Sequence, residues 1–241
     1  MKYRSHRGGV YYTPENTMPA FKYALSAGYD YIETDPQLTL DGKVVLIHDG
    51  TVNRTCRNAD GTAIEGSVVV SDITYDQLIK YDAGIALGEE FKGTKVPLLE
   101  ELLKLVEGTD VIVALDKKIK DEDVDALIDI VERYNAKVCF STSTVKRIKK
   151  IQSRIPDAMF DYDVNLEDEA LIEVCKAVKP ENLIVWMYLD KPNFASLKQI
   201  AKVDRDNYLR VKKYARVGIA NINNPVDVKE ALDLEPDVIE F

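Results

Sequence analysis

The chain has 241 residues, of which 46% are apolar, and this length is close to the roughly 250 residues of one (β/α)8 barrel. Its formal net charge of −9 argues against a nucleic acid as partner, because such binding depends on basic surface. No apolar run approaches the ~18 residues that a membrane span needs, and residues 1–6 lack the apolar segment of a secretory signal. We therefore expect a cytoplasmic protein without stable membrane insertion, built as a single domain over residues 1–241.

Short apolar, β-branched runs alternate with longer amphipathic stretches, which predicts repeated βα units around a parallel sheet. Eight strands are expected, at residues 3–7, 29–36, 111–117, 137–141, 158–161, 183–188, 216–222 and 238–241. Seven helices are expected, at residues 18–27, 98–107, 121–134, 144–153, 167–177, 193–203 and 225–232. This is the pattern of an α/β fold of the (β/α)8 TIM-barrel type.

The helix that would follow the last strand is missing from this pattern. Its absence would leave part of the apolar outer wall uncovered near residues 238–241 and 3–7, and such a patch usually binds a partner. A homodimer is one way to cover the wall, and a docked N-terminal segment is another.

The regular alternation is interrupted between residues 38 and 95. Asp41-Gly42 is a hairpin signal between the apolar runs 38–40 and 44–47. A Gly-rich polar segment follows it. We interpret about residues 50–95 as a small insertion in the loop after the strand at 29–36, where barrel enzymes carry functional extensions.

Charged residues with the same spacing lie at the ends of two of the expected strands. Glu33 and Asp35 are two residues apart, so their side chains are expected to project from the same face of a strand. Asp116 and Lys118 repeat the spacing on the next expected strand. Neighbouring carboxylates repel one another unless a cation lies between them, and oxygen ligands suit Mg²⁺ or Ca²⁺. A solvent-facing acidic edge, or a helix cap at Asp116, would explain each pair taken alone.

His6 and His48 are the only histidines in the chain. Each ends an apolar run, which is a suitable position for general acid and base catalysis near neutral pH. Arg7, followed by a glycine pair, is a candidate ligand for an anionic oxygen. A structural histidine and a surface arginine are the alternatives for residues of these types considered one at a time.

The ordered motifs of the first 120 residues form a recognisable set. They are His6-Arg7-Gly8, Pro14-Glu15-Asn16-Thr17, Ala20-Phe21, Gly28, Glu33-x-Asp35, Thr39-x-Asp41-Gly42, His48-Asp49, Arg54, Ile73-Thr74, Leu78, Asp82-Ala83-Gly84, Phe91 and residues 96–101. In this order and spacing they resemble the N-terminal signature of the glycerophosphodiester phosphodiesterase family.

The resemblance implies a role for each matching residue. His6 and His48 would be the catalytic acid and base, and Arg7 and Lys118 would contact the phosphate of the substrate. Glu33, Asp35 and Asp116 would bind one divalent cation, Mg²⁺ or Ca²⁺. The family usually has glutamate at the position of Asp116, so the shorter side chain puts the metal geometry or the choice of metal in question.

The second half of the chain departs from the family pattern. Residues 220–223 read Ala-Asn-Ile-Asn where the family commonly has Trp-Thr-Val-Asn, and the usual closing Thr-Asp is not recognisable at residues 239–241. Trp186 is a candidate substitute for the missing indole, although a buried core residue is the better interpretation.

The sequence therefore predicts metal-dependent hydrolysis of a small phosphodiester, giving an alcohol and glycerol 3-phosphate by two-histidine acid/base catalysis. One alternative is a phosphodiesterase of the lysophospholipase D type, with residues 11–12, 85–87 and Phe91 beside an acyl chain. The other is a weakened barrel that binds a ligand without turning it over.

Overall fold

Eight parallel strands form a closed barrel in the order β1, β10, β9, β8, β7, β6, β5 and β2, with helices between them, as the sequence predicts. The structure is a computed structural model and describes residues 1–164, 166–189, 203, 205–220, 222 and 224–241. The barrel strands are β1 Lys2–Ser5, β2 Tyr31–Thr34, β5 Ile112–Leu115, β6 Lys137–Thr142, β7 Met159–Tyr162, β8 Leu183–Tyr188, β9 Arg216–Ala220 and β10 Val238–Glu240. A separate antiparallel hairpin pairs β3 Pro36–Leu38 with β4 Val44–Leu46.

Six of the seven predicted helices have a counterpart with similar bounds. These are α1 Met18–Ser26, α3 Leu99–Val106, α4 Val124–Val131, α5 Val145–Gln152, α6 Asp168–Ala177 and α8 Pro225–Leu232. The helix predicted over residues 193–203 lies almost wholly outside the described residues, as do Asn221 and Asn223. The short helices α2 Tyr75–Leu78 and α7 Arg205–Val211 were not predicted. In the described part of the chain, no helix is both long and apolar enough to cross a membrane.

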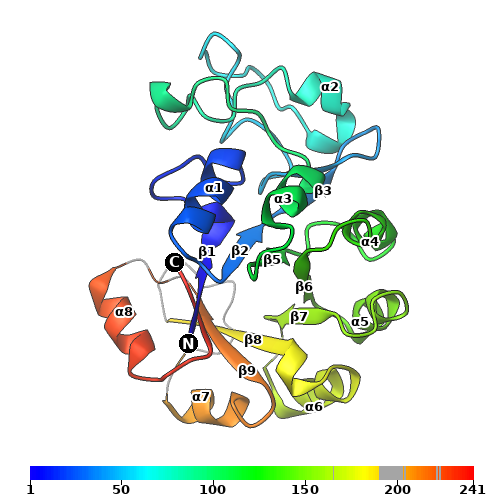
Figure 1. Cartoon of the computed structure of the whole chain (residues 1–241), viewed down its shortest axis with the longest axis vertical. Coiled ribbons are helices and arrows are strands. Elements are labelled where there is room, and N and C mark those ends of the chain that lie inside the picture. The colour runs from blue at the N-terminus through cyan, green and yellow to red at the C-terminus, as the bar shows by residue number, and fades with distance from the viewer. Residues whose placement is uncertain (165, 190–202, 204, 221, 223) are drawn as a thin grey trace. The chain divides into compact units, whose positions relative to one another are not determined.

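The chain divides into two compact units, and each is described by itself. One unit contains Met1–Arg4 and Cys139–Phe241, and the other contains Ser5–Val138. In the first, the parallel ladders run from β1 through β10, β9 and β8 to β7, with α5, α6, α7 and α8 around the outside of these strands (Figure 1). The sequence-based prediction of one domain is not tested by this division.

A buried ion network fills the interior of the first unit. The guanidinium of Arg4 donates to Glu240 through Nε and to Asp161 through Nη1, both at 2.6 Å. Its Cζ lies 3.5 Å from the centroid of the Trp186 ring. Trp186 is 1% exposed, so the prediction of a core tryptophan is confirmed. Gly218 makes room for this ring, because a Cβ there would lie 2.6 Å from it.

Replacing Arg4 with methionine is expected to destabilise the protein by about 3–5 kcal/mol, because two buried carboxylates would lose their counter-charge. Urea denaturation would measure the free energy of unfolding. The matched control adds Asp161→Leu and Glu240→Met, which removes the uncompensated charges and is expected to recover most of the loss. A single variant as stable as the parent would mean that the network contributes nothing.

The second unit carries the hairpin and the predicted insertion. Its parallel ladder pairs β2 with β5, α1 and α3 lie beside these strands, and the segment around α2 extends away from them (Figure 1). The segment has a small core of its own, formed by Val45, Ile47, Val52, Cys56, Val70, Leu78, Ala83 and Val96. This core joins the insertion to β4, so the loops on it are held by packing against the hairpin.

Candidate active site

The residues after β1 form a tight turn rather than the strand end that the sequence predicts. His6, Arg7 and Gly8 lie in a 3-10 helix, and Arg7 has a positive φ of 49°. Gly8 also has a positive φ, and a Cβ on it would lie 2.8 Å from the Cβ of Ala20 in α1. The strand prediction for residues 3–7 is therefore wrong beyond Ser5, because close packing on α1 requires the chain to turn.

Asn16 holds this turn against the end of β2. Its own φ is 56°, and its backbone N–H donates to the carbonyl of Arg7 at 2.9 Å. The side-chain Nδ2 donates to Asp35 at 2.8 Å, and Oδ1 accepts from the hydroxyl of Thr34 at 2.6 Å. Left-handed backbone at such residues is costly and tends to occur at functional sites. Asn16 thus fixes the position of an acidic side chain together with that of Arg7.

The carboxylates of Glu33 and Asp35 both contact Arg7. Glu33 accepts the backbone N–H of Arg7 at 2.8 Å, and Asp35 lies 3.5 Å from Nε of the same residue. The two acids are 7% and 1% exposed. Two carboxylates so buried need compensating positive charge, and the Arg7 guanidinium supplies part of it.

Asp116 and Lys118 complete the acidic group at the end of β5. The ammonium of Lys118 lies 3.4 Å from an oxygen of Asp116 and 3.5 Å from an oxygen of Asp35. Burial is the largest influence and would raise the pKa of Asp116, but the Lys118 ammonium and the backbone N–H and charge of Lys117 together lower it below its usual value. Lys118 therefore lies between two of the three carboxylates that the sequence singled out for a metal.

Among the described residues, no group of three or more His, Cys, Asp or Glu side chains is arranged to hold a metal ion. The donor chemistry of Glu33, Asp35 and Asp116 nevertheless fits a hard divalent cation, because all three offer carboxylate oxygens. Their formal charge of −3 exceeds the +2 of Arg7 and Lys118, which also favours a further cation. Whether the three acids bind it stays a prediction.

A chain of ion pairs connects Arg7 to His48. Glu15 accepts from Arg7 at 3.0 Å and from two nitrogens of Arg54 at 2.8 Å each. The Nε of Arg54 donates to Asp49 at 2.6 Å, and Asp49 also lies 2.6 Å from Nδ1 of His48. The hydrogen bond from Arg54 is the main cause that holds the pKa of Asp49 well below its usual range. An ionised Asp49 accepts from the imidazole and fixes the orientation of its ring.

The network gives Glu15, Asp49 and Arg54 contacts that the sequence analysis did not predict. Burial opposes ionisation of Glu15, but its hydrogen bond to Arg54 and its contacts with Arg7 lower its pKa overall. Arg54 appeared only as a motif position, and Asp49 only as the neighbour of His48. Their motif positions were the sole sequence signal, since partners 39 residues apart cannot be paired by spacing.

Seven candidate residues thus fall in one unit, at the ends of neighbouring elements. Arg7, Glu33, Asp35, Asp116 and Lys118 share direct contacts, and His48 joins them through Asp49, Arg54 and Glu15. His6 opens the turn that holds Arg7 and is partly buried. The side chain of His48 is 31% exposed.

The model of the "Glycerophosphoryl diester phosphodiesterase family" matches residues 6–163, a span that includes every candidate site residue. The chain belongs to this family. A glycerophosphodiester phosphodiesterase of Caldanaerobacter subterraneus is 40% identical over 135 residues, covering 54% of this chain and 52% of that protein. The chain thus spans about half the length of that relative in this match.

Solved structures of glycerophosphodiester phosphodiesterases share the fold. The match to one from Thermotoga maritima covers 100% of this chain and 93% of that protein, with 22% identity and a TM-score of 0.70. The match to a phosphodiesterase from Oleispira antarctica, solved with the product sn-glycerol-3-phosphate, covers 100% of this chain and 92% of that protein. The identity is 18% and the TM-score is 0.79. At these identities the likeness establishes the barrel fold.

Proposed function

We propose that this chain hydrolyses small glycerophosphodiesters to an alcohol and glycerol 3-phosphate, using a divalent cation. The observation that carries the proposal is the contact group of Arg7, Glu33, Asp35, Asp116 and Lys118, which combines anion-binding and cation-binding side chains in one place. Family membership supports it, as does the glycerol 3-phosphate product bound to the Oleispira enzyme.

Arg7 and Lys118 are the residues that would bind the phosphoryl oxygens. The guanidinium of Arg7 is planar and held by Glu15, so it presents its donors in a fixed direction. Lys118 has a flexible stem and three donors, which allow it to turn from Asp35 and Asp116 toward an arriving phosphate. Both residues then neutralise charge that increases on the phosphoryl oxygens in the transition state.

Glu33, Asp35 and Asp116 are the residues that would hold the cation, Mg²⁺ or Ca²⁺. When bound, it supplies Lewis-acid stabilisation of the phosphoryl group. Asn16 keeps one oxygen of Asp35 directed by a hydrogen bond, and the backbone N–H of Arg7 does the same for Glu33. Such secondary contacts orient metal-binding carboxylates.

His6 and His48 would divide the proton transfers. One removes a proton from the nucleophile, and the other protonates the departing alkoxide. His48 is equipped for either role, because the ionised Asp49 beside its Nδ1 leaves the other ring nitrogen for the substrate. The nucleophile is water or the glycerol 2-hydroxyl.

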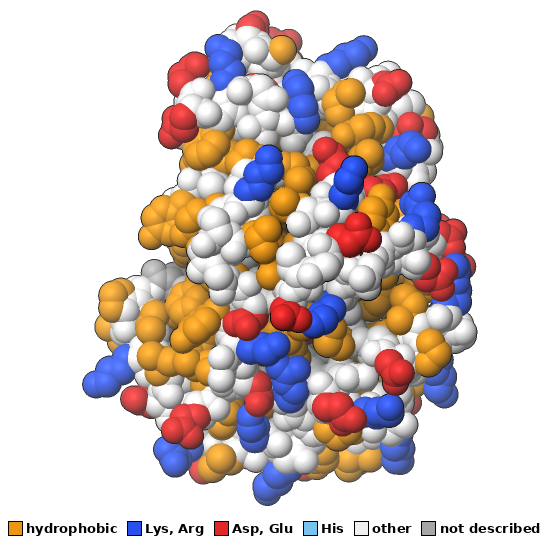
Figure 2. Space-filling model, in the orientation of Figure 1, with side chains coloured by type: hydrophobic (Ala, Val, Ile, Leu, Met, Phe, Trp, Pro, Cys, Tyr) orange, Lys and Arg blue, Asp and Glu red, His pale blue; other side chains and the backbone are white. Residues whose placement is uncertain are grey.

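The test of the proposal is a panel of glycerophosphodiesters and lysophospholipids assayed with Mg²⁺ and with Ca²⁺. Release of glycerol 3-phosphate from the small diesters is the expected result. Preference for lysophospholipids would favour the lysophospholipase D alternative, and no turnover with any metal would favour the ligand-binding barrel. The cytoplasmic location, the homodimer and the lack of a nucleic-acid partner stay predictions. On the face seen in Figure 2, acidic and basic side chains lie side by side.

Asp116→Glu is expected to keep activity within about tenfold of the parent and to change the ratio of the rates with Mg²⁺ and Ca²⁺. Glutamate is the residue that the family usually has at this position, and its longer side chain can extend to the cation. Lys118 can still form an ion pair with the glutamate. Rates with each metal, measured at saturating concentrations, check this. Asp116→Asn is the matched control, since it keeps the length and removes the charge. Complete inactivation of a folded Asp116→Glu variant would mean that the site depends on the shorter side chain.

A further inference from the structure

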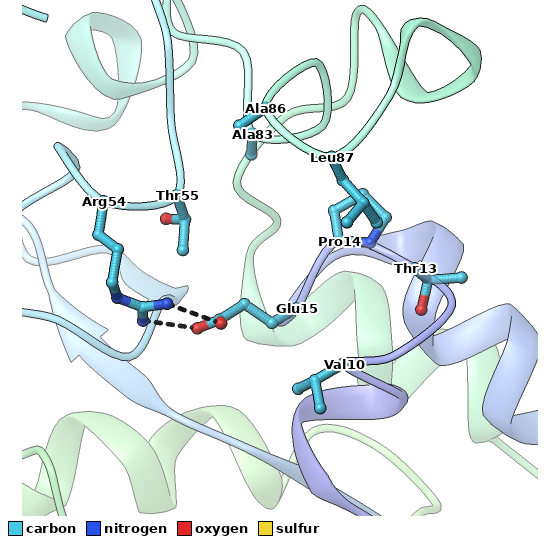
Figure 3. A pocket seen from close by; sticks show the side chains of 9 residues that line it. All are labelled: Val10, Thr13, Pro14, Glu15, Arg54, Thr55, Ala83, Ala86 and Leu87. Atoms are coloured by element: carbon cyan, nitrogen blue, oxygen red, sulfur yellow. Dashed lines mark hydrogen bonds and ion pairs between the residues drawn. The ribbon is translucent and has the colours of Figure 1, made fainter. Parts of the chain in front are cut away.

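A pocket of about 170 Å³ lies in the second unit, between the segment after the His6–Gly8 turn and the insertion. Its apolar lining comes from Val10, Pro14, Ala83, Ala86 and Leu87 (Figure 3). Leu87 is 50% exposed, so the pocket has an apolar edge that water reaches. Ala86 and Leu87 are among the residues that the sequence proposed beside an acyl chain, whereas Ile85, Phe91, Tyr11 and Tyr12 are not part of this lining.

One wall of the pocket is polar but electrically balanced. Glu15 and Arg54 face each other there, joined by two hydrogen bonds of 2.8 Å (Figure 3). Because each charge already has its partner, neither a cationic nor an anionic headgroup gains a counter-ion in this pocket. The pocket therefore favours an uncharged group.

The insertion side of the pocket is held firmly in place. Asp82, 2% exposed, accepts the backbone N–H groups of Gly84 and Ile85 at 2.9 Å each and that of Gly93 at 2.6 Å. These bonds fix both ends of the loop that carries Ala86 and Leu87. A preformed pocket loses less entropy when a ligand binds.

The pocket adjoins the residues proposed to bind phosphate. Glu15, which lines it, lies 3.0 Å from Nη1 of Arg7, and Arg54 is bonded to Asp49, the partner of His48. A substituent on a phosphate held by Arg7 can therefore extend into the pocket. Its size limits the substituent, because a cavity of about 150 Å³ accommodates benzene.

We propose that this pocket binds the alcohol part of the substrate and selects small, uncharged, apolar alcohols up to about six carbons. The inference rests on the proposed function, since it assigns the leaving group of that reaction. A long-chain lysophospholipid would gain no further contact once its acyl chain exceeds this volume, and the charge of choline would find no partner in the pocket.

The test measures kcat/KM for glycerol 3-phosphate esters of methanol, butanol, hexanol, decanol and benzyl alcohol. We expect a rise of roughly two- to fourfold per methylene up to about six carbons, and then a plateau. The choline ester and the ester of its neutral isostere, 3,3-dimethylbutanol, form a matched pair in which the neutral ester is expected to be about tenfold better. A flat series, or a preference for choline, would overturn the proposal.

Ala86→Phe fills the pocket from an exposed position, and Ala59→Phe makes the same change at an exposed alanine of the insertion outside the lining. Ala86→Phe is expected to lower kcat/KM for the benzyl ester at least tenfold and to leave the methyl ester within twofold. Ala59→Phe is expected to leave the series unchanged. Equal losses on both esters in Ala86→Phe would contradict a leaving-group pocket.

Calorimetric titration with benzyl phosphate and with inorganic phosphate separates this proposal from the proposed function. Tighter binding of benzyl phosphate by about tenfold, lost in Ala86→Phe but not in Ala59→Phe, would support the pocket even if no diester were hydrolysed. Hydrolysis of the methyl ester without that difference in affinity would support the function and refute the pocket.

Discussion

Alanine at His6 and alanine at His48 are expected to respond differently to the acidity of the leaving group. The histidine that protonates the departing alkoxide matters greatly for an alkyl ester and little for a nitrophenyl ester, which departs without a proton. The histidine that acts as base is needed for both substrates. Each loss is expected to be on the order of 10²–10⁴-fold where the proton transfer is required.

Turnover of both variants on an alkyl and a nitrophenyl diester is the measurement, with circular dichroism as the check on folding. Lys43→Ala, an exposed change in the turn of the hairpin that precedes His48, is the control and is expected to behave as the parent. Equal losses on both substrates in both variants would refute the division of roles. Near-normal activity in either variant would remove that histidine from the mechanism.

Removal of divalent cations is expected to lower activity by about 10³-fold, with recovery when Mg²⁺ or Ca²⁺ is added. The reason is that the carboxylates and the substrate phosphate both need the ammonium of Lys118. Without substrate, its ammonium lies between Asp35 and Asp116, but an arriving phosphate needs the same ammonium. Once Lys118 and Arg7 turn to the phosphate, the carboxylates of Glu33, Asp35 and Asp116 require another cation.

The measurement is activity after exhaustive chelation and dialysis, followed by titration with each metal. Asp35→Asn should bind the metal more weakly and raise the concentration needed for recovery, since it removes a charge from the centre of the acidic group. Glu122→Gln, at an exposed carboxylate outside the site, is the control. Full activity after chelation would refute metal dependence and would leave Lys118 as a counter-charge that Asp35 and Asp116 share.

The barrel and the acidic group were predictable because both depend on local periodicity. The hairpin around Asp41-Gly42 pairs Leu38 with Val44, as the apolar runs and the turn residues indicate. The two-residue spacing of Glu33 and Asp35 placed both beside one partner, which the structure identifies as Arg7. Periodicity of two in a strand is fixed by backbone geometry, so no tertiary information was needed.

The turn at Arg7 and the pairs of Arg54 could not be predicted in the same way. The turn depends on contact between Gly8 and Ala20, and the pairs join Arg54 to Glu15 across 39 residues. Such contacts exist only after α1 and the insertion have packed. The helix α7 was not predicted either, because the amphipathic pattern at residues 193–203 indicated the helix between β8 and β9 there instead.

The paired left-handed residues Arg7 and Asn16 have an evolutionary consequence. Each left-handed conformation costs on the order of 1 kcal/mol relative to ordinary backbone, and glycine would adopt it without that cost. Glycine at either position would relieve this backbone cost but would delete contacts to a buried carboxylate, so it is not expected to stabilise the protein. Glycine would remove the guanidinium that contacts Asp35 and the amide that directs it. Selection is therefore expected to keep these side-chain donors at two left-handed positions that a backbone hydrogen bond joins.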